Sequence, residues 1–208
     1  MTTIATGGFS TYDRSIAHFD SALIDGIATA GMVIGSLPFL LYLAIVQGNP
    51  MALLRDSQVQ WFLTVLLLVM ISIAGWLWLE NNMMPLAALR YATFNVASIM
   101  TGTGYATAGF DSWGSFAVPV FFFIMFIGGC AGSTTCGIKV FRFQILYETA
   151  VAQIRRLVQP HGIFIPYYNR SPITDEVTMS VMSFFFFYVL VFVVLALGLS
   201  ALGLDFIS

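Results

Sequence analysis

Charged residues are scarce in this sequence. Of its 208 residues only 9% are Asp, Glu, Lys or Arg, whereas a soluble globular domain carries about 25%. The ten acidic and eight basic residues give a net charge of -2, so the chain lacks the concentrated positive charge with which proteins bind nucleic acid. With 59% hydrophobic residues and a mean hydropathy of +0.89, the composition predicts an all-α integral membrane protein that contacts the lipid bilayer.

Cysteine and histidine, the usual residues of disulfide frameworks, metal sites and nucleophilic triads, are also rare. Cys130 and Cys136 lie in an apolar segment with no histidine nearby, so we interpret them as packing residues rather than as a redox or metal-binding pair. Ser133 lacks the Gly-x-Ser-x-Gly setting of a hydrolase nucleophile, and His18 and His161 fall outside the apolar segments. The sequence therefore predicts a protein that is not an enzyme and has no cofactor.

Long apolar segments are abundant, and about 20 apolar residues suffice to cross the hydrocarbon core of a bilayer. Four segments are candidate membrane-spanning helices, namely residues 21–46, 61–79, 116–146 and 178–202. We expect Pro38 to kink the first of them and a glycine-rich run to interrupt the third. The apolar stretch at 84–97 is too short and too polar to span, so it predicts a re-entrant half-helix.

Basic residues gather on one side of this predicted topology. The links at 47–60 and 139–177 contain six of the eight Lys and Arg residues, namely Arg55, Lys139, Arg142, Arg155, Arg156 and Arg170. By the positive-inside rule, this side is cytoplasmic. Asp25, near the outer end of the first span, is expected at the membrane interface.

Two Thr-Gly runs lie on the opposite, outer side. The first run covers residues 5–11 and the second run residues 101–107, and aligning Gly8 with Gly104 matches their patterns of small residues, glycine, aromatic residue and threonine. A monovalent cation loses its water only to a ring of oxygens, which main-chain carbonyls and Thr hydroxyls can supply where glycine permits unusual backbone angles. The pair of runs is typical of pore loops, although each run alone also fits a plain extracellular turn.

Three stretches resemble one known family. Residues 2–13 (TTIATGGFSTYD) and 88–111 (ALRYATFNVASIMTGTGYATAGFD) resemble two filter regions of the Trk/Ktr/HKT superfamily of potassium transporters. Residues 126–142 (FIGGCAGSTTCGIKVFR) resemble the broken inner helix of the third pore repeat in this superfamily. Members of this superfamily form one pore from four helix–loop–helix repeats, so the resemblance implies potassium transport.

The resemblance also implies roles for particular residues. The potassium-binding filter would include Ala5, Thr6, Gly7, Gly8, Thr101, Gly102, Thr103, Gly104 and Tyr105. A gating loop beneath the filter would include Gly128, Gly129, Cys130, Ala131, Gly132, Ser133, Thr134, Gly137 and Lys139. For Lys139 two interpretations stay open: its side chain reaches the cytoplasmic interface, or it pins the gating loop.

Partners and location follow from the same resemblance. It implies a homodimer in the bacterial inner membrane, K⁺ as the transported ion, and a cytosolic nucleotide-binding ring of TrkA type that faces the basic link 139–177.

The resemblance assigns the chain to part of such a pore. Residues 1–46 would end one repeat, 47–60 form a cytoplasmic link, 61–146 a complete repeat, 147–177 a second link, and 178–208 the outer helix of the next repeat. Two filter segments cannot encircle an ion, so we expect a piece of a transporter. The alternative is a non-conducting fragment or an assembly component that needs a second chain.

Overall fold

The computed structural model describes residues 1–169 and 171–203 and is mainly helical. It divides into two compact units, Met1–Phe141 and Arg142–Ser208, which are described separately. Arg170, one of the six cations that set the predicted topology, lies outside the described residues.

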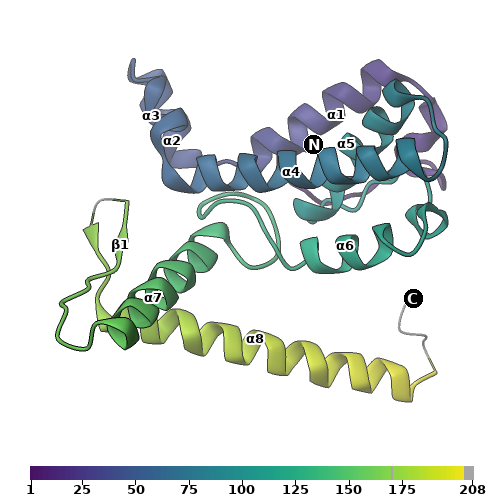
Figure 1. Ribbon diagram of the computed structural model, residues 1–208. Helices are drawn as coiled ribbons and strands as arrows, with labels where there is room; N and C mark the ends of the chain where they lie inside the picture. The colour runs from purple at the N-terminus through teal and green to yellow at the C-terminus, as the bar shows by residue number, and fades with distance from the viewer. Residues whose placement is uncertain (170, 204–208) are drawn as a thin grey trace. The chain divides into compact units, whose positions relative to one another are not determined.

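In the first unit, the three helices α1 (Ala22–Gly35), α4 (Ser57–Leu79) and α5 (Pro85–Met100) form the core, and α5 packs against both others (Figure 1). The shorter helices are η1 (Ser15–Phe19), α2 (Phe39–Val46), α3 (Met51–Arg55), η2 (Phe110–Trp113) and α6 (Ala117–Ile124).

Helix α4 is the continuous span of this unit. The Asp56 carboxylate caps its N-terminus by accepting hydrogen bonds from the backbone N–H groups of Gln58 and Val59, at 2.9 and 3.2 Å. Its buried residues recur every three or four positions, as a helix with one core-facing stripe requires: Val59, Phe62, Leu66, Met70, Ile73 and Leu77. Its length and hydropathy suffice to cross a membrane.

The other predicted spans take different forms. The segment 21–46 is a pair, α1 and α2, bent by 94° at the break before Phe39, so the kink predicted at Pro38 is present as a full break. The segment 116–146 is divided into α6, a loop at 125–139 and α7 (Val140–Val158). Helix α7 also runs on past residue 146, where the sequence places the start of a link.

Helix α5 covers the stretch predicted as a half-helix and extends it to Met100. Pro85 occupies its first position, where the missing N–H costs no hydrogen bond. Most of its second half is buried, and it ends directly at the second Thr-Gly run.

Among the described residues, two helices are long and apolar enough to span a membrane, and there are three spans if the bent pair α1–α2 counts as one.

The second unit contains most of α7, a two-stranded hairpin and α8 (Asp175–Ala201). Strands β1 (Tyr167–Tyr168) and β2 (Ser171–Pro172) are antiparallel, with Tyr167 opposite Pro172. Thr174 is the N-cap of helix α8, and its hydroxyl accepts a hydrogen bond from the Val177 N–H at 3.5 Å.

Two contacts that involve aromatic side chains join α7 to α8 in the second unit. The Arg142 guanidinium lies 3.8 Å from the centre of the Phe184 ring, and the Phe143 and Phe185 rings meet edge to face. Among the described residues of α8, Val181 is the buried one. The exposed apolar surface of α8 suits a lipid or protein environment rather than water.

The two cysteines of the α6–α7 loop differ in exposure, which makes the loop testable. Cys130 is fully buried and Cys136 is exposed. We expect maleimide to label one cysteine per chain in native membranes. Cys136→Ser should abolish this labelling and Cys130→Ser should not, whereas equal labelling of both would contradict the described loop.

Candidate functional site

The two Thr-Gly runs lie against each other in the first unit. A Cβ at Gly8, whose φ is +66°, would overlap the carbonyl oxygen of Thr103, so the two backbones meet at a distance that glycine alone permits. Behind the runs, Tyr105 is buried and its hydroxyl bonds with the hydroxyl of Thr2, which precedes the first run. The two Thr-Gly runs are separate loops in the sequence, and the fold brings them together into one site.

Exposure alternates over residues 5–7 of the first run and 101–105 of the second run. Thr6, Thr101 and Thr103 are buried, whereas Ala5, Gly7, Gly102 and Gly104 are exposed. Because these exposed residues have no side chain or only a methyl group, the accessible surface of these two stretches is mostly main chain. This surface supplies amide and carbonyl groups rather than carboxylates. It is the chemistry that suits a weakly hydrated monovalent cation.

The second run is held by polar side chains of α5. The Ser98 carbonyl accepts from the N–H of Thr103 at 2.9 Å, and the Ser98 hydroxyl donates to the carbonyl of Tyr105 at 2.6 Å. The Asn95 amide donates to the hydroxyl of Thr107 at 2.9 Å. Both side chains are fully or almost fully buried. Sequence reasoning missed these two residues, although polar residues in the last turns before a glycine-rich run are a usable signal.

The α6–α7 loop packs into the break between α1 and α2. The N–H groups of Cys130 and Thr134 donate to the carbonyls of Ser36 and Gly35, at 3.0 and 3.2 Å. The Phe39 N–H, at the start of α2, donates to the carbonyl of Gly132 at 3.0 Å. The loop thus satisfies backbone groups that the broken helix leaves open.

The same loop also touches both Thr-Gly runs. The Thr134 hydroxyl donates to the carbonyl of Ile4 at 2.8 Å, and the Thr6 hydroxyl donates to the carbonyl of Thr134 at 2.9 Å. A Cβ at Gly102 would lie 3.0 Å from the Cβ of Cys136. The loop residues named from the sequence therefore lie beside the runs and contact them directly.

The α6–α7 loop closes on itself at its base. The Gly128 N–H donates to the carbonyl of Ile138 at 2.8 Å, and a Cβ at Gly128 would overlap the carbonyl of Cys136. The Lys139 ammonium group donates to the carbonyl and hydroxyl oxygens of Ser133 and Thr135. These bonds match the interpretation in which Lys139 pins the loop, rather than the one in which its side chain reaches the cytoplasmic interface. The Lys139 ammonium group is therefore bonded to the loop.

Not every predicted feature joins the site. Phe9, the aromatic residue of the first run, is 80% exposed, unlike its counterpart Tyr105. Asp25, expected at the interface, is buried inside the protein and pairs with Arg90.

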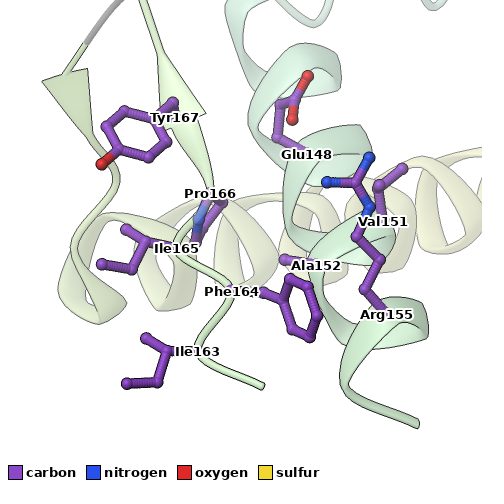
Figure 2. Close-up of a pocket in the computed structure, with 9 residues that line it drawn as sticks. All are labelled: Glu148, Val151, Ala152, Arg155, Ile163, Phe164, Ile165, Pro166 and Tyr167. Atoms are coloured by element: carbon purple, nitrogen blue, oxygen red, sulfur yellow. The ribbon is translucent and has the colours of Figure 1, made fainter. Parts of the chain in front are cut away.

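A separate hollow of about 350 Å³ lies in the second unit, between α7 and residues 163–167 (Figure 2). Glu148 and Arg155 supply its charged lining, with Phe164 and neighbouring residues as its apolar side. No residue of the Thr-Gly runs lines it.

Comparison with known proteins gives one consistent family. The family model described as TrkH, cation transport protein, matches residues 1–208. The Trk system potassium uptake protein TrkI of Halomonas elongata is 43% identical over 207 residues, which cover 99% of this chain and 42% of that protein. The Trk system potassium uptake protein TrkH of Vibrio parahaemolyticus is 36% identical over 212 residues, covering 100% of this chain and 44% of that protein.

A solved structure agrees with these matches. The crystal structure of the potassium transporter TrkH from Vibrio parahaemolyticus superimposes with a TM-score of 0.93 at 35% identity, covering 98% of this chain and 44% of that chain. The chain thus spans less than half the length of the relatives it matches. It is a mainly helical membrane protein, and because the family model matches every residue from 1 to 208, it belongs to the TrkH family of cation transport proteins.

Proposed function

We propose that this chain supplies two of the filter segments of a potassium-conducting pore and a gating loop beneath them. The observation that carries the proposal is the direct contact of Gly8 with the Thr103 carbonyl, which joins the two Thr-Gly runs, with the α6–α7 loop bonded to Thr6. Potassium is the transported ion, consistent with relatives that are named potassium uptake proteins. Main-chain carbonyls would replace its hydration shell.

In this proposal the filter residues are Ala5, Thr6, Gly7, Gly8, Thr101, Gly102, Thr103, Gly104 and Tyr105, and the gate is the segment 128–137 with Lys139. The loop closes the pore while its bonds to Thr6 and Ile4 hold it in place, and it opens when they break. The family context supports a homodimer in the bacterial inner membrane. It also supports a cytosolic nucleotide-binding ring of TrkA type that meets the basic link 139–177.

A second candidate function is an assembly component that conducts only with another chain. The observation that favours it is coverage, because the chain matches 42–44% of its relatives' length. Transport by the chain alone and transport by a completed pore therefore need separate measurement.

The first prediction concerns transport by a chimera in which residues 1–208 replace the matching segment of Halomonas elongata TrkI. We expect the chimera to restore rubidium uptake and growth at low potassium in bacteria that lack their own potassium uptake systems. The chain expressed alone should not do so, because two filter segments leave the ion's coordination incomplete. A chimera that reaches the membrane without uptake would refute the proposed function.

The second prediction concerns the contact between the runs. Gly8→Ala in the chimera should abolish the preference for rubidium over sodium, because the added methyl group displaces the Thr103 carbonyl. The matched control is Gly26→Ala, which lies in α1 with no atom within 4 Å of the added Cβ and should transport normally. Equal effects of the two substitutions would contradict the filter assignment.

The third prediction concerns the gate. Thr134→Val removes the hydroxyl that bonds to the carbonyls of Ile4 and Gly35. Loss of about 1–2 kcal/mol from the closed state should raise rubidium flux roughly 5–30-fold where the gate limits it. The control Thr64→Val removes a hydroxyl that bonds only along α4 and should leave the flux unchanged. A lower flux in Thr134→Val would show that the loop does not close the pore.

A further inference from the structure

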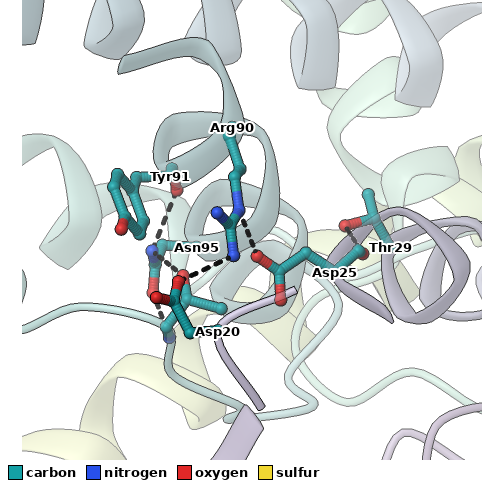
Figure 3. Close-up of polar contacts among 7 residues, drawn as sticks. Asp20, Asp25, Thr29, Arg90, Tyr91 and Asn95 are labelled. Carbon is teal, nitrogen blue, oxygen red and sulfur yellow. Dashed lines mark hydrogen bonds and ion pairs between the residues drawn. The ribbon is translucent and has the colours of Figure 1, made fainter. Parts of the chain in front are cut away.

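A buried ion pair joins the helix that follows the first run to the helix that precedes the second. The Arg90 Nε on α5 donates to the Asp25 carboxylate on α1 at 2.7 Å (Figure 3). The Asp25 side chain is 4% exposed and that of Arg90 is 26% exposed. A second carboxylate, Asp20, lies 3.3 Å from the Arg90 Nη2 but is 82% exposed.

Further bonds tie the segment that follows the first run to the second run itself. The Ala17 N–H donates to the carbonyl of Ala106 at 3.2 Å, and the Ala106 N–H donates to the Ser15 hydroxyl at 3.3 Å. Arg90 stands three turns of helix before Thr101, and Asp25 lies in the first turn of α1. The ion pair and these hydrogen bonds together connect the parts of the chain in and next to the two runs.

The packing of α1 against α5 indicates what this ion pair does: it fixes the position of one helix relative to the other. Their buried residues near the pair include Ala28, Ala88 and Ala92, whose small side chains allow the two helices to approach closely. The charge-assisted bond from Arg90 Nε to Asp25 Oδ2, at 2.7 Å, fixes the distance between the two side chains. A buried ion pair gives little net stability compared with apolar residues, so its value lies in the geometry that it imposes.

We propose that Asp25 and Arg90 are positioning residues for ion selection, because their pair sets the register of α1 against α5 and thereby the spacing of the two Thr-Gly runs. This inference rests on the proposed function of the runs as filter segments. Neither residue touches the ion. Asp20, being exposed, has no part in setting the register.

The test measures the ratio of rubidium to sodium uptake in the chimera with TrkI. This ratio does not depend on how many transporters reach the membrane, so loss of folded protein alone does not change it. We expect Asp25→Asn and Arg90→Gln each to lower the ratio about tenfold, and the double variant to resemble the single ones because the residues act as one unit. The matched control Asp20→Asn should stay within about twofold of the parent.

Variants that keep both charges guard against misfolding, since removing Arg90 leaves the buried Asp25 carboxylate without its ion-pair partner. Asp25→Glu and Arg90→Lys change the length or geometry of the pair, and we expect them to accumulate and to lower the same ratio. An unchanged ratio in these variants would overturn the proposal. So would a tighter apparent affinity for rubidium at an unchanged ratio in Arg90→Gln, which would make Asp25 a cation-attracting group instead.

The failure of this inference can be told apart from failure of the proposed function. If the parent chimera does not take up rubidium, the filter assignment itself is wrong. If the parent chimera is selective and the Asp25 and Arg90 variants are equally selective, the filter assignment is retained and the positioning role of Asp25 and Arg90 is refuted.

Discussion

Backbone hydrogen bonding inside a membrane is the constraint on which the rest of this structure depends. Lipid offers no partner for an open N–H or carbonyl, so a chain that breaks its helices within the bilayer must satisfy these groups itself. The broken pair α1–α2 and the α6–α7 loop do this for each other, through the carbonyls of Gly35 and Ser36 and the N–H of Phe39. Each irregular segment is therefore stable only where the other is present.

This mutual dependence connects the loop to the Thr-Gly runs. The α6–α7 loop, which fills the helix break, also bonds to Ile4 and Thr6 and lies against Gly102 of the second run. A movement of the loop cannot leave both the helix break and the runs unchanged, because the same few residues bond to all of them. Filter geometry and gating are thus coupled by ordinary hydrogen bonds in the proposed pore.

The charged groups of the first unit follow a similar logic. Charge is rare in the chain, and the Asp25 carboxylate is buried only because Arg90 compensates it. The exposed apolar surface of α8, in contrast, has almost no internal contacts and depends on its surroundings for burial. The first unit therefore combines an apolar core with specific polar contacts, whereas the environment of α8 is set by its hydropathy.

The sequence by itself determined the class of protein, the positions of the apolar segments, the bend at Pro38, the helix before the second run, and the glycine and threonine residues of the candidate site. These features are local, since hydropathy, proline and glycine act on their own stretch of chain. Only the tertiary structure decided that Gly8 meets the Thr103 carbonyl, that Thr134 bonds to the first run, that Asp25 is buried against Arg90, and that α7 continues to Val158. Contacts between residues so far apart in sequence depend on how helices pack in three dimensions, and no local pattern of residues encodes that distance.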